Sequence, residues 1–215
     1  RLSDPVDGKI QAFPWATWKT EFSSANEIGF DVMEWTIDHD RLYENPLMSE
    51  FGRKSITELM EQSSIKVKSL TGDCFMQAPF YKVSPDRQKI LLNDLDNVLF
   101  AASLLNISKI VFPVVDEGRI ENDAQLAILS EALLKRTTQI CNLNLKILFE
   151  SDLPPKALAS FISLFPKEAF GLNYDTGNSA SLGFNALEEI DAYGERIENV
   201  HIKDRPFQGS TVPLG

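Results

Sequence analysis

The chain has 215 residues, of which 43% are hydrophobic and 24% charged, ordinary values for a globular protein. This length predicts one domain with a full hydrophobic core. The formal net charge of −10 argues against a nucleic-acid-binding protein, whose contact surface is basic. The sequence has no apolar run of the roughly 18 residues that a membrane span needs, and no signal segment opens it.

Cysteine usage indicates a reducing environment. Cys74 and Cys141 are too few for a disulfide framework. We expect two reduced and mostly buried thiols, because free cysteine is among the most buried residue types. A cytoplasmic location is the matching expectation.

Segments with helical and strand-like patterns alternate along the chain. Apolar spacing, capping patterns and first-turn prolines predict helices over residues 15–28, from Ser55 with Glu58 three residues on, and over 85–105, 122–141, 154–165 and 187–197. Short apolar runs predict strands over residues 31–37, 65–70, 109–115, 145–149, 171–174 and 200–202. This alternation indicates repeated strand–helix units.

The predicted strands lack polar alternation, which is typical of parallel sheets covered by helices. Both an eight-stranded barrel and an open doubly wound sheet fit that pattern. The absence of a glycine-rich phosphate loop weakens the open-sheet alternative, and polar residues cluster after the strands, where a barrel concentrates function. We therefore predict an α/β fold, a TIM (β/α)8 barrel spanning residues 1–215 as one domain. Its first and last strands are expected to lie outside this sequence.

Three of the predicted strands end in a candidate metal ligand. Glu150, Asp175 and His201 are spaced by about 25 residues, the length of one strand–helix unit in a barrel. Equivalent strand ends lie on one rim, so these side chains are expected to surround one point. Two carboxylates and an imidazole suit a hard or borderline divalent cation. Taken singly, Glu150 can cap a helix or pair with a lysine, Asp175 can form a turn, and His201 can be a core histidine; together they favour a shared metal site.

The sequence resembles the sugar phosphate isomerase/epimerase family, the xylose isomerase-like barrels that include ketose 3-epimerases and endonuclease IV. The resemblance covers nearly the whole chain. The segments that carry it are 29–35 (GFDVMEW), 149–150 (FE), 173–178 (NYDTGN), 200–205 (VHIKDR) and 212–215 (VPLG).

The resemblance implies metal-ligand roles for Glu150, Asp175 and His201. The family's fourth ligand, a glutamate on the last strand that is also one of two acid/base carboxylates, has no counterpart among these 215 residues. Asn178 stands where several epimerases carry histidine and sugar-phosphate members can carry asparagine, and we expect it to bind substrate. Family enzymes commonly use Mn²⁺, with Mg²⁺, Co²⁺ or Zn²⁺ in relatives, so a divalent ion is the expected cofactor.

The predicted function is that of a metal-dependent isomerase or epimerase of a sugar or sugar phosphate. A divalent ion bound to a ketose would stabilise the enediolate formed when the C–H beside the carbonyl loses its proton. Glu150 is the predicted catalytic carboxylate. Two alternatives stay open: a metal-dependent dehydratase of a keto-polyol, and a catalytically inactive sugar-binding barrel or fragment. A DNA-repair endonuclease is disfavoured, because the chain is acidic and has two histidines.

Four further residues are predicted to bind substrate. Lys203 and Arg205 can reach a phosphate or carboxylate, although Lys203 can equally pair with Asp204. Glu34, in mid-strand, can orient substrate or support a ligand, or pair with an interior cation. Asp73, at a strand end, can hydrogen-bond substrate or be a solvated loop residue.

The expected partner is a small-molecule sugar or sugar phosphate, with neither nucleic acid nor a membrane involved. Barrels of this kind often pair, and an incomplete barrel exposes sheet edges that favour association. A homodimer is therefore a further expectation.

Overall fold

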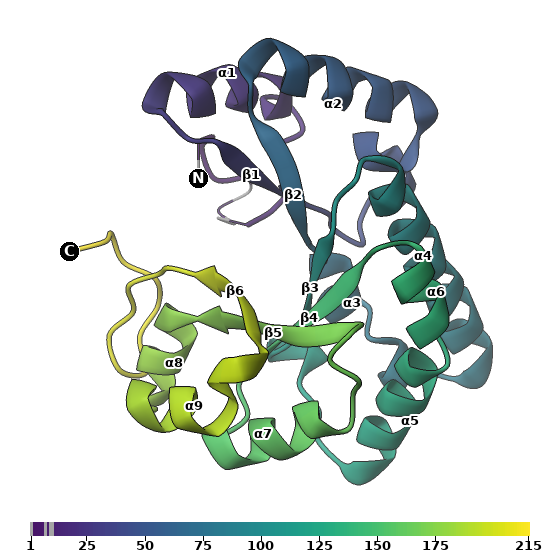
Figure 1. Ribbon diagram of the computed structural model, residues 1–215, viewed down its shortest axis with the longest axis vertical. Coiled ribbons are helices and arrows are strands. Elements are labelled where there is room, and N and C mark those ends of the chain that lie inside the picture. The colour runs from purple at the N-terminus through teal and green to yellow at the C-terminus, as the bar shows by residue number, and fades with distance from the viewer. Residues whose placement is uncertain (1, 7, 9–10) are drawn as a thin grey trace.

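A computed structural model describes residues 2–6, 8 and 11–215. Its strands are β1 (Val32–Thr36), β2 (Lys66–Thr71), β3 (Lys109–Val114), β4 (Lys146–Ser151), β5 (Phe170–Asp175) and β6 (Ile197–His201). These six strands of the described residues form one parallel sheet in the order β1-β2-β3-β4-β5-β6. The sheet curls into an open barrel, so that β1 and β6 face each other across its open side (Figure 1). The predicted α/β barrel fold is confirmed.

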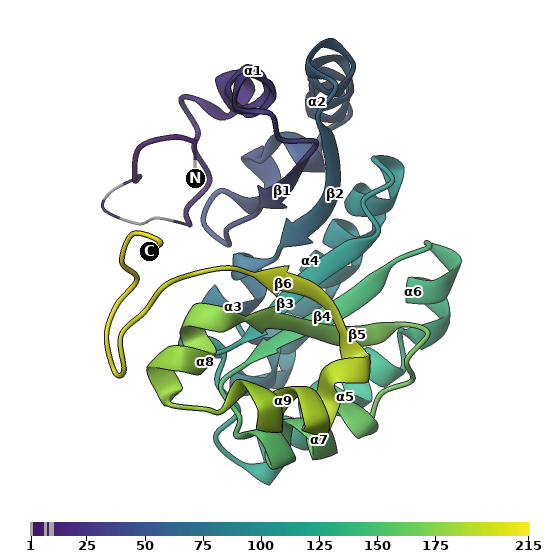
Figure 2. The ribbon, with the colours of Figure 1, turned by 60° about the vertical axis from the view of Figure 1, so that its left-hand side comes forward.

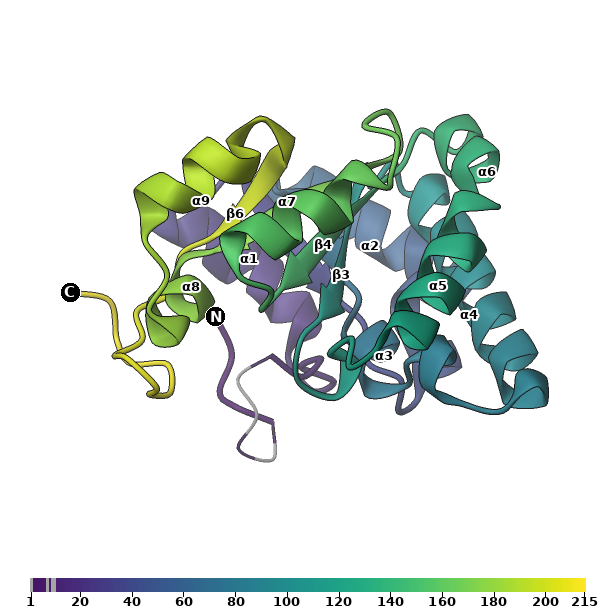
Figure 3. The same ribbon diagram turned by 90° about the horizontal axis from the view of Figure 1, so that it is seen from below.

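Helices lie outside the curled sheet, as the views in Figures 2 and 3 show. They are α1 (Trp18–Ile28), α2 (Glu50–Ser63), α3 (Asp73–Gln77), α4 (Pro85–Leu104), α5 (Asp123–Leu134), α6 (Thr137–Asn142), α7 (Pro155–Ser163), α8 (Thr176–Leu182) and α9 (Ala186–Tyr193). All of these helices except α1 lie between two consecutive strands in the chain, and this strand–helix alternation leaves the inner face of the sheet to other side chains. No helix in the described part of the chain is both long and apolar enough to cross a membrane.

The helix boundaries differ most from the predicted ones at three places. Helix α2 begins at Glu50, not at Ser55, because the Ser49 hydroxyl accepts a hydrogen bond of 3.0 Å from the Gly52 amide and caps the helix there. The helix predicted over 122–141 is divided into α5 and α6 around Lys135 and Arg136. The last predicted helix ends at Tyr193 and passes into a short 3-10 turn.

An aromatic cluster between the sheet and α7 determines which way β4 faces. Phe149 is fully buried, and its ring centroid lies 4.9 Å from the rings of Phe161 and Phe165. Burying a phenylalanine side chain contributes roughly 1.5–3 kcal/mol. Because neighbouring strand residues point to opposite faces, anchoring Phe149 on the helix side turns Glu150 to the inner face of the barrel.

The two cysteines are both free, but they differ in exposure. Cys74 in α3 is buried, and burial raises the pKa of its thiol. Cys141 near the end of α6 is exposed, so the expectation of mostly buried thiols is wrong for this residue. Residue 141 belongs to α6, a short helix on the outside of the curled sheet (Figure 1).

Candidate metal centre

Glu150, Asp175 and His201 converge at the carboxyl ends of three consecutive strands. One potential ligand atom from each lies within 4.8 Å of the others. Nδ1 of His201 is 3.2 Å from Oε2 of Glu150 and 3.9 Å from Oδ2 of Asp175. The two carboxylate residues are buried, at 6% and 5% exposure. The structure thus brings together the three residues predicted from their spacing.

Strand register explains this convergence. Asp175 on β5 is the parallel partner of His201 on β6, and Asn173 pairs with Asn199 two residues earlier. Side chains two residues apart on a strand share a face. Both pairs therefore point to the same side of the sheet, and the interior there is polar.

Two asparagines hold the Glu150 carboxylate. Asn173 Nδ2 donates a hydrogen bond to Oε2 at 2.7 Å, and Asn178 Nδ2 donates to Oε1 at 2.8 Å. Asn178 lies in the first turn of α8, where its backbone amide donates to Oδ1 of Asp175 at 2.9 Å. Asp175 therefore caps α8 with one oxygen and leaves the other facing the site. Glu150 does not cap α7, which begins without a side-chain cap.

Oδ2 of Asp175 indicates that the site suits a cation. This oxygen is buried and accepts no hydrogen bond of good geometry, although the Lys203 ammonium lies 2.7 Å away. A buried carboxylate oxygen needs a positive partner. Lys203 supplies one here, rather than pairing with Asp204. One imidazole nitrogen and two carboxylate oxygens form a donor set that suits a divalent ion of the Mn²⁺, Zn²⁺ or Mg²⁺ kind.

His201 also contacts a carboxylate from the opposite edge of the sheet. Its Nε2 lies 2.7 Å from Oε1 of Glu34 on β1. Burial disfavours the charged imidazolium, but the hydrogen bonds to Glu150 and Glu34 outweigh it and raise the pKa of His201 to about 10. Burial alone would raise the pKa of Glu34, yet its hydrogen bond to and attraction by His201 lower it.

Two adjoining cavities of about 410 and 400 Å³ open beside these residues. Glu34 and His201 line the first, Glu150 and Asp73 line the second, and Lys203 lines both. Cavities of this size fall in the range of small-molecule sites. The three candidate ligands and the cavities therefore lie in one continuous interior at the carboxyl ends of the strands.

Asp73 is buried at 5% exposure, so it is not a solvated loop residue. Burial, followed by repulsion from Asp38 and Glu150, raises the pKa of its carboxyl to about 7. The carboxyl is thus poised to exchange a proton near neutral pH, on the wall of the cavity that Glu150 lines.

Arg205 is engaged by the protein. Its NH1 donates to Oδ1 of Asn178 at 2.6 Å, and its Nε and NH2 donate to the Gly209 carbonyl at 3.0 and 2.9 Å. The guanidinium connects the chain after β6 to α8. Its side chain also lines the 400 Å³ cavity, so Arg205 orients Asn178 and borders that cavity.

Sequence reasoning missed Asn173, Asn199 and Thr71 at this site. Each lies on the inner face, and the two asparagines precede a predicted ligand by two residues. Strand parity was the available signal, because a polar residue two positions before an inward ligand must itself point inward.

No protein-family profile and no curated protein matches this sequence. Solved structures do match. A xylose isomerase domain protein from Planctomyces limnophilus matches with a TM-score of 0.72 and 14% identity, over 91% of this chain and 74% of the other. A D-psicose 3-epimerase from Clostridium cellulolyticum H10, solved with D-tagatose, matches with 0.70 and 13%, over 86% and 67%.

A third structure carries both the barrel and a metal. It is a xylose isomerase-like TIM barrel protein from Mycobacterium smegmatis in complex with magnesium, with a TM-score of 0.66 and 16% identity over 91% of this chain and 69% of the other. The chain has the xylose isomerase-like TIM-barrel fold. It spans between 67% and 74% of the lengths of these three proteins.

Proposed function

We propose that this chain is a metal-dependent isomerase or epimerase that moves a proton next to the carbonyl of a sugar or sugar phosphate. The observation that supports the proposal most is the convergence of Glu150, Asp175 and His201 at three strand ends, beside cavities of sugar-binding size. The fold supports it further, because one matching structure is a D-psicose 3-epimerase solved with D-tagatose.

Glu150, Asp175 and His201 are the residues that would hold the metal. When bound, a divalent ion supplies positive charge that polarises the substrate carbonyl and offsets the negative charge left by proton removal. The magnesium in the Mycobacterium smegmatis protein supports a hard divalent ion on this fold. We propose Mn²⁺ for this chain, because a mixed nitrogen and oxygen donor set suits it.

Glu150 is the proposed proton acceptor. It lines the 400 Å³ cavity, and the hydrogen bonds from Asn173 and Asn178 hold both of its oxygens in place. A fixed carboxylate needs little reorganisation to meet the substrate C–H, which lowers the barrier to proton transfer. In an isomerisation the protonated Glu150 would return the proton to the neighbouring carbon. In an epimerisation a second acid on the opposite face would donate a proton to the same carbon, and Glu150 would keep the one it took.

Lys203 is the proposed contact for an anionic group of the substrate. Its ammonium borders both cavities and rests on Asp175. A divalent ion on Asp175 would satisfy that carboxylate, and the ammonium could then reach a phosphate or an oxygen of the substrate. Asp73, Asn178 and Glu34 are proposed to complete the polar wall around the sugar.

The test combines metal binding with a substrate panel. Mn²⁺ affinity is measured by calorimetry for the wild-type protein and for Asp175→Ala, and ketoses and ketose phosphates are incubated in D₂O with and without Mn²⁺. We expect wild-type binding, loss of binding in Asp175→Ala, and metal-dependent deuterium exchange at the carbon beside the carbonyl. Unchanged Mn²⁺ uptake by Asp175→Ala would contradict the site.

The same panel separates the alternatives. A dehydratase would release water and give an unsaturated or rearranged product, which mass spectrometry detects as a loss of one water molecule. A sugar-binding barrel would bind a sugar and exchange no deuterium. Either result would replace the isomerase proposal.

A further inference from the structure

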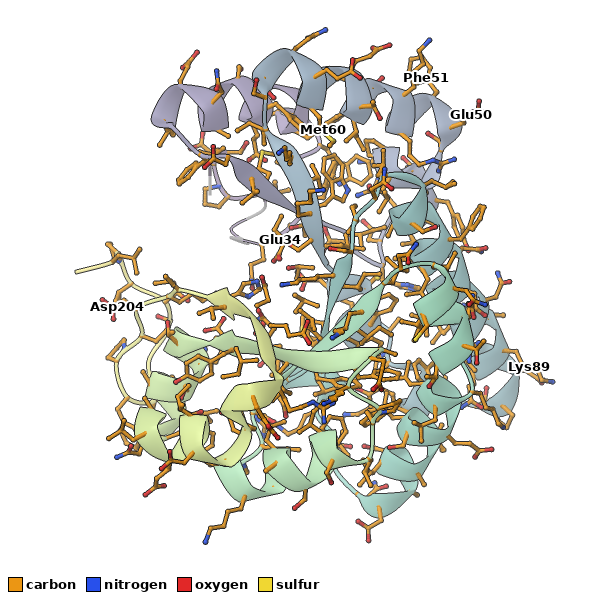
Figure 4. The ribbon with its side chains drawn as sticks, viewed as in Figure 1. Glu34, Glu50, Phe51, Met60, Lys89 and Asp204 are labelled. Atoms are coloured by element: carbon orange, nitrogen blue, oxygen red, sulfur yellow. The ribbon has the colours of Figure 1, made fainter. Side chains whose placement is uncertain are left out.

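Glu34 reaches the candidate metal centre from the far edge of the sheet. It lies on β1, and Figure 4 shows it pointing from that strand toward the interior of the curled sheet. Its Oε1 is 2.7 Å from Nε2 of His201 on β6, although the two residues are 167 positions apart. The contact therefore bridges the first and the sixth strands of the described sheet.

Other side chains fix the Glu34 carboxylate in this position. Thr71 on β2 donates its hydroxyl proton to Oε1 at 2.5 Å, and Asn199 on β6 contacts Oε2 through Nδ2 at 3.4 Å. The Glu34 side chain is 24% exposed and that of His201 is 17% exposed. A carboxylate restrained by donors on two other strands can restrain the imidazole in turn.

The two imidazole nitrogens have different surroundings. Nε2 faces Glu34, and an ionised carboxylate can only accept a hydrogen bond, so Nε2 carries a proton. Nδ1 faces Nδ2 of Asn173 at 3.0 Å, Oε2 of Glu150 at 3.2 Å and Oδ2 of Asp175 at 3.9 Å. Without a metal the ring is charged and Nδ1 is also protonated. Loss of the Nδ1 proton on metal binding, with the Nε2 proton kept on the Glu34 side, would leave the Nδ1 lone pair directed at the space between the two carboxylates.

We propose that Glu34 is a positioning residue for the metal centre: it keeps the proton of His201 on Nε2 and aims the Nδ1 lone pair at the point between Glu150 and Asp175. The inference rests on the metal site of the proposed function. It gives Glu34 a contact with the imidazole in addition to its proposed place in the polar wall of the cavity. A carboxylate behind a ligating histidine typically changes metal affinity by about 10–100-fold.

The first test measures Mn²⁺ affinity by calorimetry in wild type, Glu34→Ala and Glu34→Gln. We expect Glu34→Ala to weaken binding about 10–100-fold. Glu34→Gln should retain part of the affinity, because its amide oxygen still accepts from Nε2–H, and it also serves if the alanine variant folds poorly. Asp73→Asn is the matched control, since it removes a carboxylate from the same interior that is not a hydrogen-bond partner of His201 in the described structure; its affinity should change less than about threefold.

The second readout is the tautomer of His201 in the Zn²⁺-loaded protein, read from ¹⁵N chemical shifts. We expect a protonated Nε2 and a metal-bound Nδ1 in the wild type, and a mixture of tautomers in Glu34→Ala.

Three results would overturn the inference in different ways. Equal affinities and tautomers in wild type and Glu34→Ala would reject the role of Glu34 and leave the metal site standing. If Asp73→Asn weakened Mn²⁺ binding as much as Glu34→Ala, the effect of Glu34 would come from its negative charge alone and not from its hydrogen bond to His201. A wild-type protein that binds no Mn²⁺ would reject the metal site itself, and the positioning role with it.

Discussion

Glu150 and Glu189 are both buried glutamates, at 6% and 2% exposure, yet their surroundings differ. Glu189 in α9 accepts hydrogen bonds from the hydroxyls of Tyr174 (2.9 Å), Tyr193 (2.7 Å) and Ser179. The space beside it measures about 20 Å³, room for about one water molecule. Glu150 instead is held by two asparagine amides, faces an imidazole and lines a cavity of about 400 Å³.

This difference distinguishes a buried carboxylate that can reach a ligand from one that only stabilises the fold. The hydroxyl donors around Glu189 come from β5, α8 and α9, so the carboxylate joins three elements and leaves no room for a ligand. Burial and the adjacent carboxylate raise the pKa of Tyr193 well above its ordinary value, which keeps that phenol a donor. Burial of an acid alone therefore does not mark a site; its partners and its access to a cavity do.

Glu150→Gln gives the largest expected effect. Deuterium exchange or turnover on the substrate identified from the panel should fall by about 10³-fold at saturating Mn²⁺, because a glutamine amide cannot take the proton. Measured as kcat, this loss should occur without a comparable loss of folding free energy. Glutamine still offers a carbonyl oxygen to Asn173 or Asn178. A variant that keeps its kcat would remove Glu150 from the proton-transfer step.

Glu189→Gln should have the opposite profile. We expect the free energy of unfolding, measured with urea, to fall by about 3 kcal/mol, because the hydroxyl donors lose a charged acceptor in a buried place. Mn²⁺ affinity should not change. Glu188→Gln is the control, since that neighbouring residue on α9 is exposed and should change stability by less than about 0.5 kcal/mol. Weaker metal binding in Glu189→Gln would erase the distinction between the two glutamates.

The sequence was sufficient to predict the fold class and the three ligand candidates. Glu150, Asp175 and His201 stand at one strand end after another, and a parallel sheet converts that period into proximity. The neighbours that hold Glu150 were also open to prediction, because Asn173 shares a strand face with Asp175. Which residues of a strand share a face follows from their spacing in the sequence alone, without knowledge of the tertiary structure.

Contacts across the open side of the sheet could not be predicted. The Glu34–His201 hydrogen bond depends on how far six strands curl, a property that accumulates over the sheet. The Glu189 cluster depends on the path from α8 to α9, where Gly183 takes a left-handed conformation with φ of 74°. Helix α2 was placed too late because Ser49 caps it without the glutamate that completes a capping box.

Asp73→Asn tests how the stability of the protein depends on pH at the candidate site, where Asp73 lines the same cavity as Glu150. Because the folded protein raises the pKa of this carboxyl from 3.8 to about 7, the folded state holds its proton between these values while the unfolded state releases it. The contribution of this carboxyl to the free energy of unfolding is therefore fully present below about pH 4 and is lost as the pH rises to about 7. Because each pKa unit is worth about 1.4 kcal/mol, we expect Asp73→Asn to be about 4 kcal/mol more stable than the wild type at pH 8. At pH 4 the two proteins should be equally stable. Urea titrations at the two pH values measure the difference, and equal differences at both would refute the assignment.

Tyr174→Phe should give the smallest effect, because it removes one hydroxyl of the Glu189 cluster and keeps the ring. The hydroxyl donates to Oε2 of Glu189 at 2.9 Å, and Ser179 donates to the same oxygen. That oxygen therefore keeps a donor, and the cost should be about 1 kcal/mol of unfolding free energy. In a Glu189→Gln background the same substitution should cost less, since the charged acceptor is gone, and a double-mutant cycle would report a coupling of about 0.5 kcal/mol or more. Zero coupling would mean that the hydroxyl acts through packing or solvent, and that Glu189 joins α8 and α9 without β5.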